Sequence, residues 1–293
     1  MNNIIIWGIG KIYNQMRNNI SYFEEKNQIK VEYILVSNPY MKKLDGYIVK
    51  SPEDISNLDY DYIIIMSDDY YEEILNEALI RRVERDKIIS YKVLQIPNIN
   101  LNRYFYLKEK NISIISNNCW GGVIYSTLGL ECLSPFKNLY LTDEDYLKVI
   151  SNLEYYLKQE PVFDRLEKDP HSCKQYPILK LKDIEIHCNH SDSYKDAIRD
   201  WNRRKIKLNY NNIFYEMYTE KKESAEKFYD LTLNSNSICF VPWETKKEKT
   251  LTLQMAPNQN EFYETVNSNA TIGSNALKYE LVELLLGNVY TRY

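Results

Sequence analysis

One cysteine stands where a thiol could act as a nucleophile. Cys119 follows the apolar run Ile112–Ser116 and precedes an apolar-faced helix expected to end near Leu130. The N-terminus of a helix offers free N–H groups and a positive dipole end, which lower the pKa of a thiol and can hold an oxyanion or a phosphate. Three interpretations are open: a nucleophile, a cradle for a phosphate or sugar, and a small buried packing residue. The residues that would line the cradle are Asn117, Asn118, Trp120, Gly121 and Gly122.

A thiol nucleophile requires a base, and histidine is the usual one. His187 ends the apolar run Ile184–Ile186, which is expected to be a parallel strand of the same sheet. Because the carboxyl ends of parallel strands meet at one edge of a sheet, we predict that His187 is the catalytic partner of Cys119. Asn189 or Asp192 would orient the imidazole ring.

A metal site is a weaker alternative at the same place. His187, Cys188 and His190 lie close together in the sequence, and Cys173 precedes them. Their spacing matches no standard zinc finger, and alternation along a continued strand would point the two histidines to opposite faces. The sequence therefore predicts no metal site.

Three consecutive basic residues could bind phosphate oxygens. Arg203, Arg204 and Lys205 lie on a helix that is expected to begin after Ser193. Arginine forks match the oxygens of a diphosphate, so this run could clamp one. The alternative is a solvated charged face, on which Asp200 pairs with Arg204 one turn away.

A second candidate binding site lies near the start of the chain. Asn3–Trp7 is a short apolar run typical of a buried parallel strand, and a glycine turn then leads into a helix. Strand, glycine turn and helix in this order form a phosphate-binding unit, with Gly8, Gly10 and Lys11 as its cofactor-binding residues.

This unit departs from a dinucleotide site in two ways. Tyr13 occupies the place of the third glycine, and Asn38 stands near the end of the second strand where an acid would bind the ribose. These departures favour a nucleotide or nucleotide-sugar over NAD. The alternative is a scaffold whose glycines only make a tight turn.

These candidate sites imply an α/β fold in two domains. Residues 1–105 are predicted to form a Rossmann-like parallel sheet with the first strand in a central position. Residues 106–293 are predicted to form a larger second α/β domain, with Thr142 and Ser193 as helix N-caps. The expected strands are 3–7, 31–36, 47–49, 60–66 and 87–89 in the first domain, and 112–116, 184–187, 213–218, 237–241 and 248–255 in the second.

Both domains resemble known families. Trp7–Lys11, Ser51–Asp54 and Asp61–Ser67 are similar to segments of small Rossmann-like domains that are attached to bacterial sugar-modifying enzymes and glycosyltransferases. A second resemblance is carried, within residues 112 to about 240, by the segments Ile115–Gly122, Leu128–Leu130, Ser134–Leu139, Tyr176–Ile178, Asp183–His187 and Trp201–Ile206. In these segments the chain resembles the family called domain of unknown function 1919, of which some members are labelled exopolysaccharide biosynthesis proteins. The sequence departs from the family pattern at Thr219–Lys222, where a Thr-Asp-Arg-Asp type of segment is expected.

Composition limits the possible partners and compartment. The chain of 293 residues has a formal net charge of −4, which argues against a general nucleic-acid binder. No stretch is long and apolar enough to span a bilayer, and Met1–Trp7 lacks the features of a secretory leader. The five cysteines are an odd number at irregular spacing, which is typical of reduced thiols in the cytoplasm.

The preferred prediction is an enzyme of cell-surface polysaccharide or glycoconjugate biosynthesis. It would be a transferase acting on a nucleotide-sugar or another sugar-linked substrate, which is what the resemblance implies. One alternative is a non-catalytic nucleotide-sugar binding or regulatory module. Another is a cysteine-dependent hydrolase or acyltransferase, which follows from Cys119 and a histidine base.

Overall fold

The chain folds into two compact units, which are described separately. The structure is a computed structural model that describes residues 1–169, 174–255, 261–270 and 279–288. Unit 1 comprises Met1–Glu109 and unit 2 comprises Lys110–Tyr293. The sequence placed the boundary four residues earlier, before the end of the helix α3 (Leu101–Glu109). This helix belongs to unit 1, where the Leu101 N–H donates to Gln28 and the Tyr62 hydroxyl donates to Glu109.

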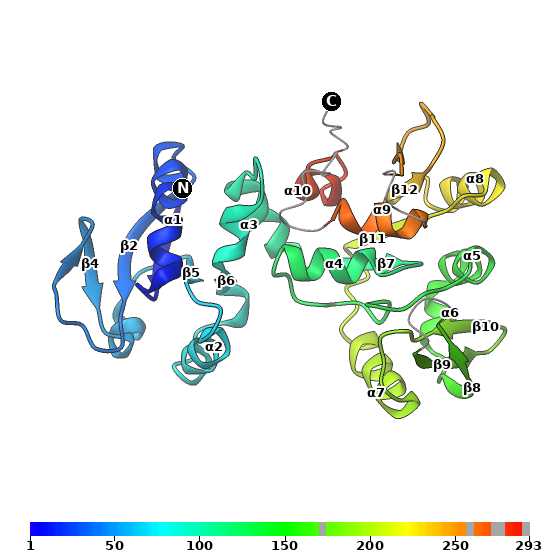
Figure 1. Cartoon of the computed structure of the whole chain (residues 1–293), viewed down its shortest axis with the longest axis horizontal. Helices are drawn as coiled ribbons and strands as arrows, with labels where there is room; N and C mark the ends of the chain where they lie inside the picture. Colours follow the sequence, from blue (N-terminus) through cyan, green and yellow to red (C-terminus); the bar gives the residue numbers. More distant parts are fainter. Residues whose placement is uncertain (170–173, 256–260, 271–278, 289–293) are drawn as a thin grey trace. The chain divides into compact units, whose positions relative to one another are not determined.

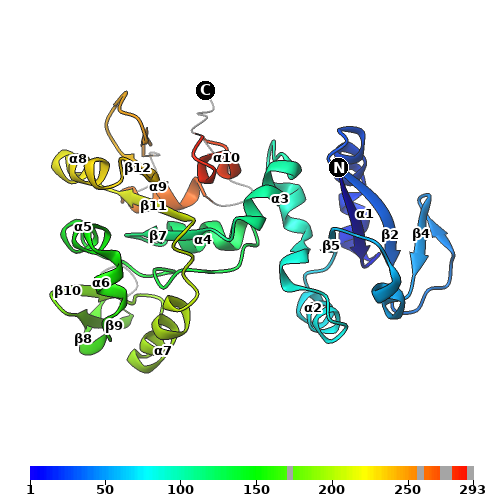
Figure 2. The same ribbon diagram turned by 180° about the vertical axis from the view of Figure 1, so that it is seen from behind.

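Unit 1 is built on a six-stranded sheet in the order β3-β4-β2-β1-β5-β6. Neighbouring strands are parallel except for the antiparallel pair β3 and β4. The first strand pairs with β2 on one side and β5 on the other, which confirms its predicted central position. Figure 2 shows β4 and β2 side by side, with β5 farther along the sheet, beyond β1. The strands are β1 (Asn2–Trp7), β2 (Ile29–Leu35), β3 (Lys43–Leu44), β4 (Tyr47–Lys50), β5 (Tyr62–Ile65) and β6 (Ile88–Ser90).

Helices cover both faces of this sheet. From β1 the chain moves outward to β2 and β4, and it then crosses back to β5 and moves outward to β6 on the other side. Since such crossovers are right-handed, α1 (Lys11–Glu25) and α2 (Tyr71–Ile80) lie on opposite faces. Ile5 and Trp7 pack in one cluster with Leu75 and Ala78 of α2. This two-sided burial explains why β1 reads as an unbroken apolar run.

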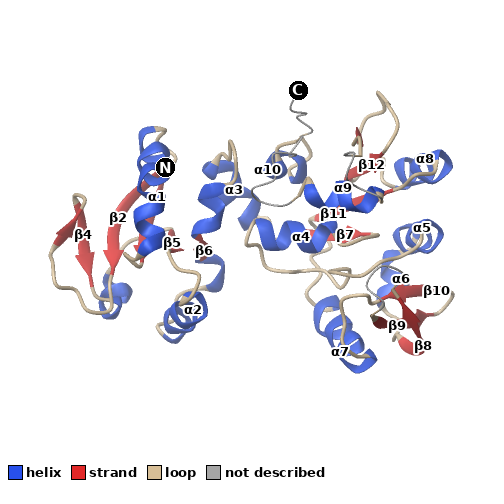
Figure 3. Ribbon diagram, viewed as in Figure 1, coloured by secondary structure: helices blue, strands red, loops and turns tan. Residues whose placement is uncertain are grey.

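Unit 2 contains a parallel sheet of four strands in the order β13-β12-β11-β7. Its strands are β7 (Ser113–Ser116), β11 (Ile213–Tyr218), β12 (Asn236–Val241) and β13 (Thr250–Thr252). The predicted caps are confirmed, because Thr142 accepts from the Asp145 N–H and Ser193 accepts from the Asp196 N–H. Strands and helices of both units are distinguished by colour in Figure 3. The helices are α4 (Trp120–Thr127), α5 (Asp143–Ser151), α6 (Leu153–Leu157), α7 (Tyr194–Lys205), α8 (Lys222–Leu231), α9 (Phe262–Ser268) and α10 (Leu281–Leu285).

A second sheet in unit 2 corrects one prediction. Ile184–His187, expected as a parallel strand of the main sheet, is instead the edge strand β10 of an antiparallel sheet. Only Lys182 and Asp183 separate it from its neighbour, and so short a turn permits antiparallel pairing alone. Figure 1 shows this sheet beside α6 and α7. Its other strands, which the sequence did not predict, are β8 (Val162–Lys168) and β9 (Gln175–Leu181).

The two sheets of unit 2 share one apolar core. Ile115 and Met217 from the parallel sheet belong to the same buried cluster as Leu179 and Ile186 from the antiparallel sheet. Trp201 of α7 also belongs to this cluster and is 3% exposed. The antiparallel sheet is therefore an integral part of unit 2.

Two glycines of unit 1 allow a test of the turn after β1. Gly8 has φ = 107°, which strains any residue with a side chain, whereas Gly10 has φ = −74° and open space around a Cβ position. We expect Gly8→Ala to lower the free energy of unfolding by about 1–2 kcal/mol and Gly10→Ala, at an N-cap where alanine is only moderately disfavoured, by about 0.5–1 kcal/mol. Urea unfolding followed by tryptophan fluorescence measures both. Equal midpoints for the two variants would contradict the turn described here.

Candidate functional site

Cys119 lies in contact with a histidine. Its sulfur and Nε2 of His190 are 3.2 Å apart. Cys119 caps the N-terminus of α4 and is partly exposed, and His190 lies on an exposed turn after β10. A thiol and an imidazole within hydrogen-bond reach, both accessible, form the pair that nucleophilic catalysis by cysteine requires.

Backbone hydrogen bonds bring the two residues together from different sheets. The Leu141 N–H donates to the Asn117 carbonyl, which ties the segment after β7 to the segment before α5. Tyr140 and His187 exchange two backbone hydrogen bonds of 2.9 Å, which tie the end of β10 to that same segment. As a result, the turn after β10 lies beside the start of α4.

The predicted partnership of Cys119 with His187 is not the one that the structure forms. Nδ1 of His187 is 3.4 Å from the Tyr176 hydroxyl, and its ring meets Tyr140 edge-on with the centroids 5.4 Å apart. The physical reason is the antiparallel hairpin. Strand β10 ends at His187, and the turn that follows it brings His190 to the sulfur instead. The sequence contains three histidines that could supply the base, His171, His187 and His190, and the analysis preferred His187 because it ends a strand; the position of His190 three residues beyond that strand gives a weak signal at most.

Both members of the pair favour their neutral forms. Burial of the sulfur raises the pKa of Cys119 to about 11, and the nearby Glu216 carboxylate adds to this rise. Partial burial of the ring lowers the pKa of His190, and the charge of Lys174 lowers it further. The pKa of the thiol is therefore raised, where the sequence predicted a lowered one, and burial is the largest cause. At neutral pH the resting pair is a thiol beside an unprotonated imidazole.

Asn117 and Asn118 hold the loop before Cys119. The side chain of Asn117 donates to the carbonyl of Tyr218 and accepts from its N–H, both at 3.1 Å, so it extends the pairing of β7 with β11. The Asn118 amide donates to both oxygens of Glu216, at 2.9 and 3.0 Å, and its oxygen accepts from the Trp120 N–H. Both asparagines are buried, so the structure uses their amides to position the loop.

Glu216 is a functional candidate that sequence reasoning missed. It lies in the middle of β11 and is fully buried, and its burial raises its pKa to about 8. Hydrogen bonding by Asn118 opposes this rise. The available signal was an acidic residue within an otherwise apolar strand, since such a residue is almost never buried without a partner.

The three other loop residues have packing roles. Trp120 is fully buried, stacks on Phe214 and donates from Nε1 to the Tyr279 hydroxyl. A Cβ at Gly121 would lie 2.6 Å from Oγ of Ser116, and one at Gly122 would overlap the Asn138 side chain. The two glycines therefore allow α4 to approach β7 and the loop around Asn138 closely.

The basic run on α7 makes local ion pairs. Arg203 and Arg204 both bind Asp200, with N–O distances of 3.2 and 2.7 Å. Lys205 binds Glu160 at 2.6 Å and is largely buried. The pairing of Arg204 with Asp200 is the one that the sequence offered as the alternative, but Arg204 and Lys205 are largely buried, so only Arg203 lies on a solvated face. None of these contacts supports the phosphate clamp. Thr219 lies in the segment that departs from the family pattern. Its hydroxyl donates a hydrogen bond to Asp143.

No metal site forms among the residues that the structure describes. No group of three or more histidine, cysteine or acidic side chains is arranged to hold an ion there. Cys173, considered with His187, Cys188 and His190 as a weak zinc set, lies outside the described residues.

No helix in the described part of the chain is both long enough and apolar enough to cross a bilayer.

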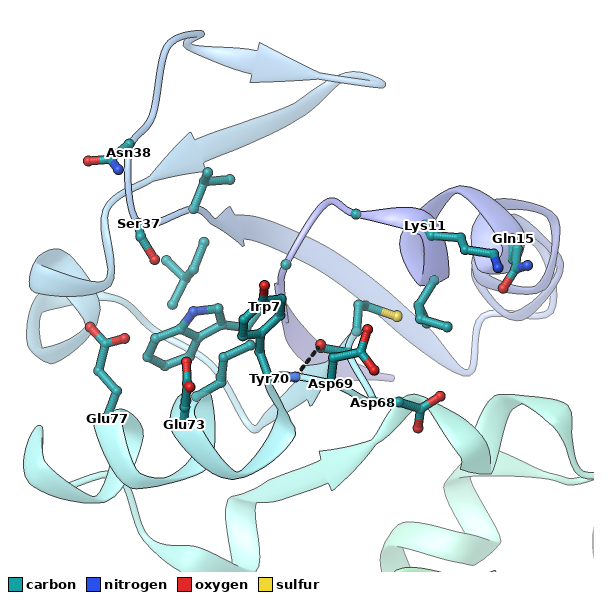
Figure 4. A pocket seen from close by; sticks show the side chains of 18 residues that line it. Trp7, Lys11, Gln15, Ser37, Asn38, Asp68, Asp69, Tyr70, Glu73 and Glu77 are labelled. Atoms are coloured by element: carbon teal, nitrogen blue, oxygen red, sulfur yellow. Dashed lines mark hydrogen bonds between the residues drawn. The ribbon is translucent and has the colours of Figure 1, made fainter.

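Gly8, Gly10 and Lys11 line a cavity of about 710 Å³ in unit 1 (Figure 4). It opens at the carboxyl end of β1, where the sequence predicted a ligand site. Residues after β2 and β5 complete its wall, together with the first turns of α1 and α2. The cavity belongs to unit 1 alone.

Comparisons with known proteins cover both units. A family model described as "Domain of unknown function (DUF1919)" matches residues 90–285, and a model described as "C2185-like, N-terminal" matches residues 1–89. A protein of Haemophilus influenzae described as an uncharacterized protein is 36% identical over 137 residues. These residues are 46% of this chain and 63% of the relative, so the match spans less than two thirds of the relative's length.

The buried Glu216 makes stability depend on pH. Its folded-state pKa of about 8 lies above its ordinary value of 4.5, so the folded protein holds a proton that the unfolded chain releases between these values. Stability is therefore fully present below about pH 4.5 and falls by about 1.4 kcal/mol per pH unit up to about pH 8.

The substitution Glu216→Gln should remove this dependence, because a glutamine carries no proton to lose. Thermal unfolding between pH 5 and 8 measures the effect, and the exposed Glu220→Gln is the matched control. Parallel pH profiles for the unsubstituted protein and Glu216→Gln would show that Glu216 titrates normally.

Proposed function

The chain belongs to the family called domain of unknown function 1919, and we propose that it is a cysteine-dependent group-transfer enzyme. The observation that carries this proposal is the 3.2 Å contact between the Cys119 sulfur and Nε2 of His190. Of the alternatives raised by the sequence, acyl transfer or hydrolysis fits this geometry best, since a thiol with an imidazole base is suited to attack a carbonyl carbon.

In the proposed reaction His190 acts as a general base. As the sulfur attacks the carbonyl carbon of an activated acyl donor, the thiol proton moves to Nε2 of His190. The leaving group then departs with that proton, and a thioester remains on Cys119. An acceptor hydroxyl attacks the thioester, gives its proton to His190, and the thiol is restored when that proton returns to sulfur.

The first turn of α4 would stabilise the oxyanion of each step. Backbone N–H groups in the first turn of a helix lack intrahelical acceptors, and Asn118 takes only that of Trp120. Those of Gly121 and Gly122 are therefore the candidate donors next to the sulfur. The neutral resting state of the thiol supports a base that acts during attack, in place of a preformed thiolate.

We further propose that the acceptor is a sugar hydroxyl in a precursor of a surface polysaccharide or glycoconjugate. This setting is supported by the family resemblance, and it makes the protein a transferase on a sugar-linked substrate. We place the reaction in the cytoplasm, an assignment supported by the free thiols of Cys119, Cys132, Cys188 and Cys239.

Acylation of Cys119 by a simple activated ester tests the proposal without knowledge of the natural donor. We expect p-nitrophenyl acetate to give a thioester at Cys119, located by mass spectrometry after proteolysis. Cys119→Ala should abolish the adduct, and Cys119→Ser should nearly abolish it because a hydroxyl is far less acidic than a thiol. His190→Ala should slow acylation by roughly a hundredfold or more, since it removes the base.

Two control variants accompany this experiment. Cys132→Ala removes another free and partly exposed cysteine, and His187→Ala removes the histidine that contacts Tyr176. Both should keep the acylation rate within about twofold if the variants stay folded. Equal labelling of Cys119 and Cys132 would show that Cys119 is not a specific nucleophile. An unchanged acylation rate in His190→Ala would show that His190 is not its base.

A further inference from the structure

The cavity of unit 1 lies at the reversal point of its sheet. β2 lies on one side of β1 and β5 on the other, and the loops after all three strands line the cavity. In open α/β sheets this is the place where the diverging loops leave a crevice for a ligand. A volume of about 710 Å³ lies within the usual range of small-molecule sites.

One side of the cavity suits an anion. Gly10, at the N-cap of α1, provides no side-chain cap, and the first turn of α1 contains no acidic residue. The N–H groups of this turn therefore lie at the cavity without a negative partner from α1 itself. The exposed Lys11 also lines the cavity and makes no ion pair within the described part of the chain.

The opposite side carries carboxylates that are not neutralised. Asp69 and Glu73 line the cavity, and among the described residues neither makes an ion pair. Asp68 and Glu77, which also line it, are engaged by Lys92 and Arg81. Figure 4 shows Glu73 extending from α2 toward Trp7, with Lys11 at the start of α1. Free carboxylates accept hydrogen bonds from hydroxyl groups and repel a second anion.

This arrangement differs from that of a dinucleotide site. Asn38 follows β2 in place of an acid, and Tyr13 is buried at the third glycine position, where its hydroxyl donates to Asp45. The acids that could bind a ribose or hexose lie instead after β5 and on α2.

We propose that unit 1 binds a phosphorylated polyol in this cavity, with the phosphate at the start of α1 and the hydroxyl groups at Asp69 and Glu73. The polyol is the ribose of a nucleotide or the hexose of a nucleotide-sugar. This site is independent of Cys119, so the proposal stands or falls separately from the thiol chemistry.

Isothermal titration of the full chain tests the proposal with a panel of probes: UDP, UDP-glucose, ADP-glucose, GDP-glucose and glucose 1-phosphate. We expect at least one of them to bind saturably. Lys11→Ala should weaken that binding roughly tenfold, because a charged hydrogen bond to the phosphate is lost. Glu73→Ala should weaken it by a similar factor through lost contacts to hydroxyl groups.

Matched controls separate local from general effects of charge. Glu72→Ala removes an exposed acid next to Glu73 that does not line the cavity, and Lys42→Ala removes an exposed lysine outside it. Neither should change the affinity. A Glu73→Ala effect seen with UDP-glucose but not with UDP assigns the wall to the hexose, and an effect seen with both assigns it to the ribose.

Two results would overturn the proposal. The first is the absence of saturable binding by every probe. The second is binding that changes equally in Glu73→Ala and Glu72→Ala, or equally in Lys11→Ala and Lys42→Ala. Acylation of Cys119 is measured separately, so a failure here leaves the proposed function of unit 2 untouched.

Discussion

A single buried amide organises the centre of unit 2. Asn118 donates to both carboxyl oxygens of Glu216 and accepts from the Trp120 N–H, so it joins the middle of β11 to the first turn of α4. Cys119 stands between these contacts, and its backbone has little freedom as a result. Because Glu216 is fully buried, losing Asn118 would remove hydrogen bonds from an acid in the core, which is far more costly than losing an exposed hydrogen bond.

The imidazole reaches the sulfur by a separate route. His190 is carried by the antiparallel sheet, which is tied to the end of β7 through Tyr140 and Leu141. The thiol and its base therefore come from different sheets, and they meet only when the shared apolar core has formed. This arrangement holds the distance between the sulfur and the imidazole, because each residue lies close to the end of a strand or helix and not on a long free loop.

Local sequence patterns predicted most of unit 1 and the start of unit 2. The apolar run before Gly8, the helix period after it and the caps Thr142 and Ser193 each depend on neighbours within a few residues, so they can be inferred from the sequence. The pairing of Cys119 with His190 depends on contacts across 71 residues and on a hairpin that the sequence analysis did not expect. Glu216 was equally out of reach, because tertiary packing decides whether a charge is buried, whereas the pairing of Arg204 with Asp200 follows from their spacing of four residues on one helix.

The two units offer different chemistry. Unit 2 presents a neutral thiol and a base, which suits covalent transfer, whereas the unit 1 cavity combines a helix N-terminus with free carboxylates, which suits reversible binding. Under the two proposals, unit 1 would bind a phosphorylated sugar and unit 2 would acylate a hydroxyl group.

Site-resolved alkylation of the native protein tests the central claim most directly. Iodoacetamide labelling of Cys119, followed by mass spectrometry from pH 6 to 10, reports both the access and the ionisation of the thiol. We predict labelling without denaturant, at a rate that is still rising with pH above pH 9, because burial raises the pKa of Cys119 to about 11. A Cys119 that resists labelling until urea is added would contradict the account, since it would make this residue part of the packed core.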